Sequence, residues 1–110
     1  MSELSILYKE DGLVVVNKPP RIAVHRSAAT ANDVKFLLQE LRNQVDCHVH
    51  PIHRLDRGTS GCILFATRQE WVPELSKQFQ DNQVQKQYQA IVRGHAPETI
   101  EVDYALKVKS

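Results

Sequence analysis

The sequence predicts an α+β fold, a mostly antiparallel mixed sheet with two helices. Residues 13–16 and 61–66 are short runs rich in apolar, often branched side chains, which is typical of buried strands. Residues 33–45 instead carry apolar side chains three and four positions apart, the spacing of one helix face. A length of 110 residues, with 42% hydrophobic and 25% charged residues, fits one soluble globular unit rather than a disordered chain.

The first half of the chain is expected to form two strands and a helix. Residues 6–8 predict a short strand, and residues 13–16 predict a second one that is buried on both faces. Two prolines end the second strand, because proline donates no hydrogen bond to a sheet. Asn32 is expected to cap a helix over residues 33–45, whose apolar stripe comprises Val34, Leu37, Leu38, Leu41 and Val45.

The second half begins with a strand and a helix. Residues 61–66 predict a buried strand. Thr67 and Glu70 have the spacing of a capping box, which would open a helix that runs to about residue 82. Pro73 leaves a second start open, near Val72, because proline is tolerated in a first helical turn. The buried face of this helix is expected to carry Leu75 and Phe79.

Two further strands are expected near the C-terminus. Residues 85–92 alternate between polar and apolar side chains and end before a glycine. Residues 100–106 alternate cleanly, which would place Ile100, Val102, Tyr104 and Leu106 on one face. Because the chain ends directly after this strand, we expect residues 1–110 to be the N-terminal portion of a larger domain.

Charge and cysteine content narrow the class of protein. A formal net charge of +1 excludes the broad cationic surface of a histone-like protein, so any phosphate contacts must come from a local patch. The two cysteines form no C-x-x-C pair, which favours a reducing compartment. No secretory signal is visible, and the longest apolar run is too short to cross a bilayer. We expect a soluble cytoplasmic protein with no membrane partner.

Residues 47–61 hold the densest set of reactive side chains. One interpretation is a zinc site, but the spacing of Cys47 and the neighbouring histidines matches no zinc finger, so no metal is expected. Another is a hydrolase triad of Ser60, His53 and Asp56. The string around Ser60 lacks the G-x-S-x-G pattern, and triads are assembled from separate elements, which argues against this interpretation.

A third interpretation makes Asp56 a lone catalytic carboxylate. Arg54 and Arg57 flank it, and a nearby guanidinium favours the ionised form of a carboxylate. The residue types alone favour a surface Asp–Arg pair without a catalytic role, which is worth about 0–1 kcal/mol, because such pairs are common. The residues by themselves therefore do not establish the catalytic interpretation.

One string in this segment resembles the H-R-L-D-x-x-T-S-G signature of the RluA family of pseudouridine synthases: His53-Arg54-Leu55-Asp56-Arg57-Gly58-Thr59-Ser60-Gly61. Residues 13–19 resemble the family's opening strand and K-P turn, and residues 86–94 resemble its K-x-Y-x-A-x-V-x-G strand. The match begins near residue 6, so no S4 RNA-binding domain is expected. The sequence of residues 24–27 is most similar to that of a bacterial tRNA-modifying branch of the family. Arg21 departs from the pattern, because the family usually has glycine there.

The resemblance implies the pseudouridine synthase catalytic-domain fold, with residues 1–110 as its N-terminal portion. It implies that the protein isomerises uridine to pseudouridine in structured RNA. Asp56 would be the essential aspartate, acting as a nucleophile at C1′ or on the ribose in an elimination. Arg54 would fill the gap left by the flipped uridine, and Tyr88 would stack on the freed uracil. An isomerisation exchanges no electrons or groups, so no cofactor is expected.

The expected partner is RNA, with tRNA as the first candidate and rRNA as the second. Contacts with its phosphates are predicted for one basic stretch free of acidic residues, which comprises Lys18, Arg21, His25 and Arg26. Support of the catalytic loop is expected from His53, Thr59, Ser60 and Gly61. The alternative is a non-catalytic RNA-binding remnant of the same fold, and the 110-residue form is expected to depend on the rest of its domain for activity.

Overall fold

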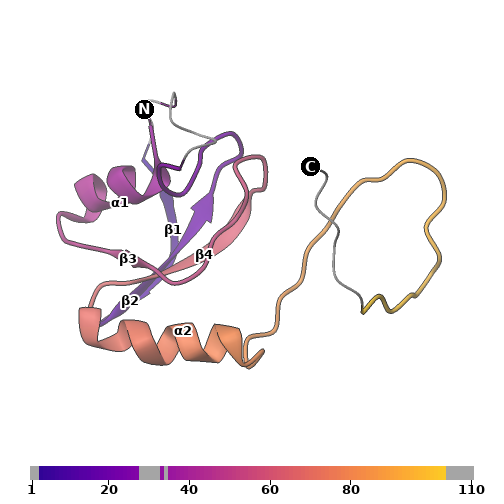
Figure 1. Ribbon diagram of the computed structural model, residues 1–110. Helices are drawn as coiled ribbons and strands as arrows, with labels where there is room; N and C mark the ends of the chain where they lie inside the picture. The colour runs from indigo at the N-terminus through magenta and orange to yellow at the C-terminus, as the bar shows by residue number, and fades with distance from the viewer. Residues whose placement is uncertain (1–2, 28–32, 34, 104–110) are drawn as a thin grey trace.

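The computed structural model describes residues 3–27, 33 and 35–103, and it has an α+β fold (Figure 1). A four-stranded antiparallel sheet has the order β1-β2-β4-β3. In chain order the elements are β1 (Ser5–Glu10), β2 (Leu13–Lys18), α1 (Leu37–Val45), β3 (His50–Pro51), β4 (Gly61–Ala66), the short 3₁₀ turn η2 (Gln69–Trp71) and α2 (Val72–Gln80). Within the described part of the chain, no helix has the length and apolarity needed to cross a membrane.

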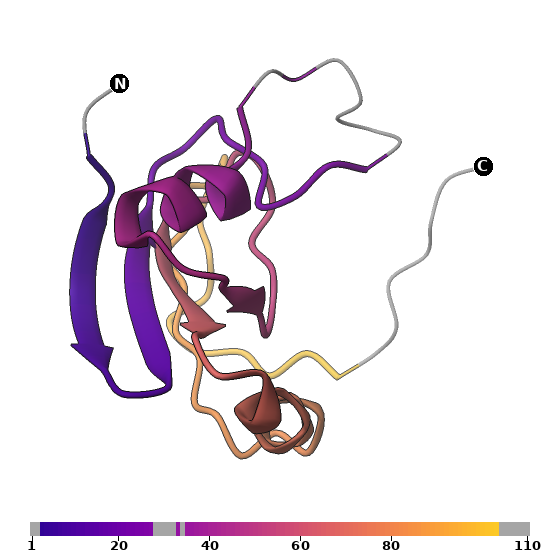
Figure 2. The same cartoon turned by 90° about the vertical axis from the view of Figure 1, so that its left-hand side faces the viewer.

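The main core lies between α1 and one face of the sheet. Val14 and Val16 of β2 stand opposite Phe65 and Ile63 of β4, and all four side chains are fully buried. Full burial of such a side chain contributes about 1.5–3 kcal/mol. The other face of β2 is only half-buried, so the prediction of a strand buried on both faces was wrong. Val15 on that face lines a hollow together with Phe79 of α2, and α2 lies on the opposite side of the sheet from α1 (Figure 2).

Helix α1 begins four residues later than the sequence predicted. Phe36 is extended, with φ −131°, and forms a parallel bridge with Ala23. The Leu37 and Leu38 N–H groups then donate to the carbonyls of Ala23 and Val24, each at 2.9 Å. Backbone acceptors from a distant segment thus replace the expected Asn32 cap. The apolar stripe is confirmed where it is described, since Leu37 and Leu41 are fully buried, while Asn32 and Val34 lie outside the described residues.

Helix α2 begins at Val72, the second of the two starts that Pro73 left open. No side-chain capping bond is formed at Trp71, so the capping box does not set this helix start. The Trp71 ring instead packs on Gly12, where a Cβ atom would come within 2.8 Å of it. Phe79 is half-buried, as the predicted apolar face requires.

Neither predicted C-terminal strand forms in the described residues. Residues 84–103 are irregular and almost wholly exposed, and they run away from the sheet (Figure 1). The prediction for residues 85–92 was wrong, because alternation supplies a strand's faces but not the neighbouring strand that must bind its backbone. Ile91 is 104% exposed, so no other described residue packs against its side chain. Residues 104–106 of the last predicted strand lie outside the described residues.

Candidate functional site

The motif that contains Asp56 lies on the loop between β3 and β4, and Lys18 ties this loop to the end of β2. The Lys18 side chain is fully buried, and its Nζ donates to the carbonyl oxygens of Pro19 at 2.9 Å, Ile22 at 2.8 Å and Arg57 at 3.0 Å. Burial lowers the pKa of Lys18, the charge of Arg57 lowers it further, and the charge of Asp56 raises it. Lys18 therefore braces the loop from within.

The predicted contact between Lys18 and an RNA phosphate is wrong for this structure, because no donor of its buried ammonium is left for solvent. The sequence did contain a signal. Side chains alternate across a strand, so Lys18 shares a face with Val14 and Val16, which are core residues. The strand periodicity would have placed this lysine inside.

The carbonyl oxygen of Arg57 accepts a second hydrogen bond, in addition to the one from Lys18. The Arg21 N–H donates to it at 2.8 Å, and Arg21 has φ +70°, a left-handed conformation. The Arg57 guanidinium pairs with Asp33 at 3.1 Å, rather than with Asp56. The turn after β2 and the motif loop are thus joined at one carbonyl.

Asp56 is exposed at the start of a turn. The Thr59 N–H donates to the Asp56 carbonyl at 3.0 Å and closes this turn. Among the residues that the structure describes, none forms an ion pair with the Asp56 carboxylate, so the surface Asp–Arg pair is absent. Arg54 is also exposed. Both side chains face solvent from a braced backbone, which leaves the carboxylate available to a ligand.

His53 anchors the first residue of the motif. Its ring stacks on Phe79 of α2, with centroids 4.4 Å apart and 18° between the planes. Its Nε2 accepts a hydrogen bond from the Leu64 N–H of β4 at 3.0 Å, which requires an unprotonated Nε2. Burial lowers the pKa of His53, and the positive charge of Lys86 lowers it further. A neutral imidazole therefore links the loop to β4 and α2.

A hollow of about 970 Å³ brings the rest of the motif near Tyr88. This loop hollow is lined by Val15, His53, Leu55, residues 58–64, Phe79 and residues 84–89. It therefore unites Thr59, Ser60 and Gly61 with Tyr88, whose side chain is 63% exposed. Gly61 starts β4 at φ +128°, a conformation that favours glycine. Asp56 and Arg54 belong to the same loop but do not line this hollow.

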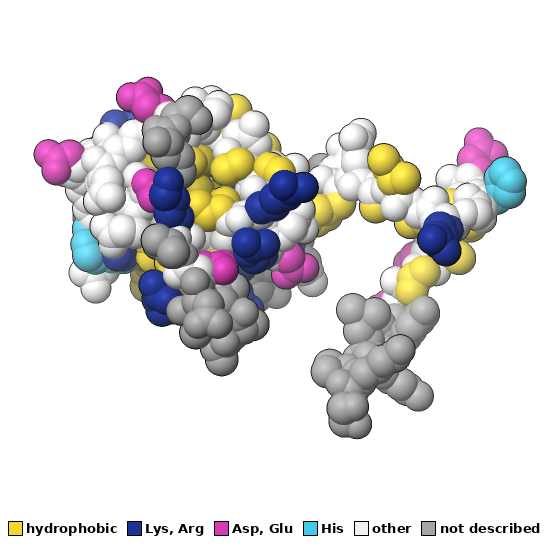
Figure 3. Space-filling view, turned by 90° about the horizontal axis from the view of Figure 1, so that it is seen from above, with side chains coloured by type: hydrophobic (Ala, Val, Ile, Leu, Met, Phe, Trp, Pro, Cys, Tyr) yellow, Lys and Arg dark blue, Asp and Glu magenta, His cyan; other side chains and the backbone are white. Residues whose placement is uncertain are grey.

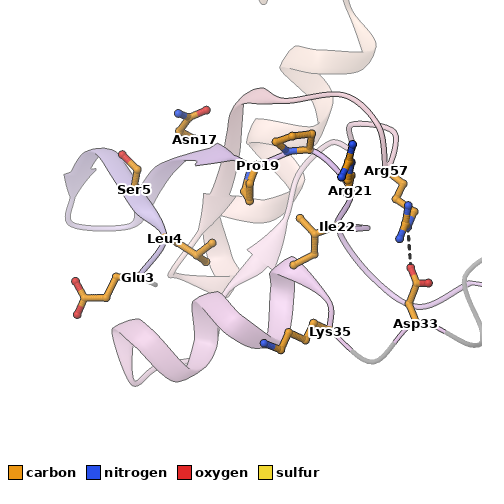
Figure 4. Close-up of a pocket in the computed structure, with 11 residues that line it drawn as sticks. Glu3, Leu4, Ser5, Asn17, Pro19, Arg21, Ile22, Asp33, Lys35 and Arg57 are labelled. Atoms are coloured by element: carbon orange, nitrogen blue, oxygen red, sulfur yellow. Dashed lines mark hydrogen bonds and ion pairs between the residues drawn. The ribbon is translucent and has the colours of Figure 1, made fainter. Parts of the chain in front are cut away.

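The predicted basic stretch is divided in the structure. Lys18 is internal, His25 is half-buried, and the Arg26 guanidinium lies 4.4 Å from the centre of the Phe36 ring. Arg21 is exposed and lines a second hollow together with Lys35 and Arg57 (Figure 4). Sequence reasoning missed the last two residues, because residues 21, 35 and 57 meet only in the folded chain.

Comparison with known proteins agrees with the motif. A family model described as RNA pseudouridylate synthase matches residues 12–110. Similar proteins named tRNA pseudouridine synthase C include one from Haemophilus ducreyi, 50% identical over 96% of this chain and 44% of the relative. Another, from Pasteurella multocida, is 49% identical over 96% of this chain and 44% of the relative. The chain thus spans 44% of the length of these curated relatives.

Solved structures show the same fold. Human RNA Pseudouridylate Synthase Domain Containing 4 aligns with 72% of this chain and 30% of its own, with a TM-score of 0.53 and 28% identity. The protein named Domain Containing 1 of the same series aligns with 72% of this chain and 28% of its own, with a TM-score of 0.57 and 24% identity, which speaks for the fold alone. With a family model covering residues 12–110, the chain belongs to the RNA pseudouridylate synthase family.

Proposed function

We propose that this chain carries the catalytic aspartate of a pseudouridine synthase that acts on tRNA in the cytoplasm. One observation carries the proposal: Asp56 lies in the full family motif, exposed and without an ion pair among the described residues, on a loop braced by Lys18. The names of the relatives support tRNA as the substrate. The two free cysteines are consistent with a reducing compartment.

The reaction is an isomerisation that a carboxylate is suited to assist. The C1′–N1 bond breaks, the uracil rotates, and C5 bonds to C1′, while the proton of C5 is released and N1 gains one. Breaking the glycosidic bond builds positive charge on the sugar, which an ionised carboxylate stabilises. Asp56 supplies that carboxylate.

The target uridine must leave its stack before a side chain can reach C1′, at a cost of a few kcal/mol. Arg54 is proposed to fill the vacated space, because it is exposed two residues from Asp56. Tyr88 is proposed to stack on the freed uracil, since it is exposed and shares the loop hollow with Thr59 and Ser60. Both roles are supported by the complete H-R-L-D-x-x-T-S-G signature at residues 53–61, which favours the enzyme over a non-catalytic remnant.

Release of tritium from tRNA labelled at C5 of uridine tests the role of Asp56. The assay uses this chain joined to the remaining part of the Haemophilus ducreyi relative, because the chain spans 44% of that relative. The Asp56→Asn variant keeps the side-chain size but loses the charge, so we expect release to fall by about 100-fold or more. The matched control is Asp46→Asn. It makes the same chemical change at the C-cap of α1, where φ is +54° and asparagine is well tolerated, so release should stay at the wild-type rate. Equal release by wild type and Asp56→Asn would refute the catalytic role.

A further inference from the structure

We propose that the second hollow binds a nucleotide of the RNA next to the target uridine, with its phosphate at Arg21. This Arg21 hollow is lined by residues 3–5, Asn17, residues 19–22, Asp33, Lys35 and Arg57, and its volume is about 550 Å³. The proposal rests on the proposed function, because it assumes that the protein binds RNA. It adds a binding site that is separate from the loop hollow, since the two hollows share no lining residue.

The shape and chemistry of the Arg21 hollow suit a nucleotide. Leu4, Pro19 and Ile22 converge in the hollow and give it an apolar floor against which a base can lie (Figure 4), and Asn17 also lines it. From above, hydrophobic side chains are open to view between Lys and Arg side chains (Figure 3). An apolar floor with polar groups at its edge is the usual composition of a small-ligand site.

The charge at the rim favours an anion. Arg21, Lys35 and Arg57 come from the turn after β2, the approach to α1 and the motif loop. Asp33 is already paired with Arg57 at 3.1 Å, so these two charges offset each other. Glu3, the other carboxylate of the lining, lies at the end of the hollow away from Arg21 (Figure 4). Arg21 and Lys35 form no ion pair with the described residues, so their charges are available to a phosphate.

The backbone of Arg21 supplies an independent argument. Its φ of +70° is strained for any residue with a Cβ, and glycine would adopt it freely. Strained residues persist where the surrounding structure enforces them, and they cluster at binding and catalytic sites. Here the Arg57 carbonyl fixes the Arg21 N–H, and the side chain lines the hollow. The arginine thus brings a cation to this rim at the expense of backbone strain.

The position of the hollow identifies which nucleotide it would bind. Arg57 follows Asp56 in the loop, and its carbonyl holds both Lys18 and Arg21. A nucleotide in the Arg21 hollow would therefore lie beside the motif loop rather than in the loop hollow, where Tyr88 lies. This placement fits a neighbour of the flipped uridine in the same RNA.

The test compares tRNA binding with thermal unfolding, both measured on this chain joined to the remaining part of the Haemophilus ducreyi relative. Arg21→Gly removes the cation and also relieves the strain, so we expect several-fold weaker binding with a melting temperature no lower than that of the wild type. The slope of log K against log salt should become shallower by about 1, the effect of losing one phosphate contact. Lys35→Ala should reduce the slope similarly. Lys77→Ala, which removes one exposed charge from α2, should change neither affinity nor slope.

The outcomes separate a failure of the proposed function from a failure of the site. If the wild-type form of this joined protein binds no tRNA, the proposed function fails together with the site. If the wild type binds but Arg21→Gly and Lys35→Ala keep its affinity and slope, only the Arg21 hollow is refuted. A loss of self-association in these variants with unchanged tRNA binding would also refute it, because a second copy would then occupy the hollow.

An oligoribonucleotide with an abasic site should bind more weakly than its intact form, and equal binding would rule out the base on the apolar floor.

Discussion

A buried ammonium group remains charged only where acceptors replace the water that it has lost. Lys18 meets this requirement with three carbonyls, one of which belongs to Arg57 in the motif loop. Its charge alone predicted a surface contact, whereas its position in β2 decides its role. The same distinction applies to Arg57, whose guanidinium pairs with Asp33 and leaves Asp56 unpaired within the described residues. Charge in a sequence predicts the chemistry of a side chain but not its partner.

The neutral state of His53 predicts a pH dependence of stability. Its pKa is lowered in the folded chain, first by burial and then by Lys86, so between that value and the ordinary 6.5 the unfolded chain binds more protons. The contribution of neutral His53 to the free energy of unfolding is therefore complete above about pH 6.5, and it is lost as the pH falls through the folded-state pKa. We therefore expect the melting temperature to fall as the pH is lowered from about 8 to about 5, as measured by thermal unfolding.

The matched variants for this measurement are His53→Gln and His95→Gln. His95 is exposed on the irregular segment, so its removal should leave the pH dependence unchanged. His53→Gln should lower the melting temperature at pH 8 and flatten its dependence on pH. A pH profile that stays the same in His53→Gln would mean that another group causes it.

At the scale of elements, the sequence predicted the segments whose apolar pattern by itself shows which face is buried. The strand over residues 61–66 has the predicted bounds, and the apolar stripe of α1 faces the core as its spacing requires. The start of α1 was misplaced, because the acceptors that begin it belong to Ala23 and Val24, which local sequence does not reveal. Residues 85–92 failed as a strand for the same reason, since a ladder partner is a property of the whole fold.

The packing of η2 on the β1–β2 turn gives a prediction at this scale. Gly12 has φ +99°, and an added Cβ would lie 2.8 Å from the Trp71 ring, so Gly12→Ala combines backbone strain with a clash. We expect a loss of about 1–2 kcal/mol or more in unfolding free energy, measured by denaturant titration. Gly58→Ala is the control, because open space surrounds its position and its φ is not positive. Equal stability of the two variants would contradict the contact with Trp71.

At the scale of the whole molecule, a packed sheet region carries a long exposed segment. The radius of gyration is 15.9 Å, against about 13 Å for a compact chain of this length. Residues 84–103 extend from the packed region (Figure 1), and they expose Tyr88, Ile91, Val92, Ile100 and Val102. The motif and its family could be predicted from sequence. The division of the basic stretch into an internal brace and a rim at the Arg21 hollow required the folded chain.

The most direct test of the central claim uses a hybrid protein, because this chain spans 44% of its curated relatives. The chain replaces the matching part of the Haemophilus ducreyi relative, with which it is 50% identical. Circular dichroism first establishes that the hybrid and its variants melt cooperatively. Pseudouridine is then measured in treated tRNA. We predict that the hybrid forms pseudouridine, that its Asp46→Asn variant does so at the same rate, and that its Asp56→Asn variant does not. Equal product from the folded hybrid and its Asp56→Asn variant would contradict the assignment of Asp56.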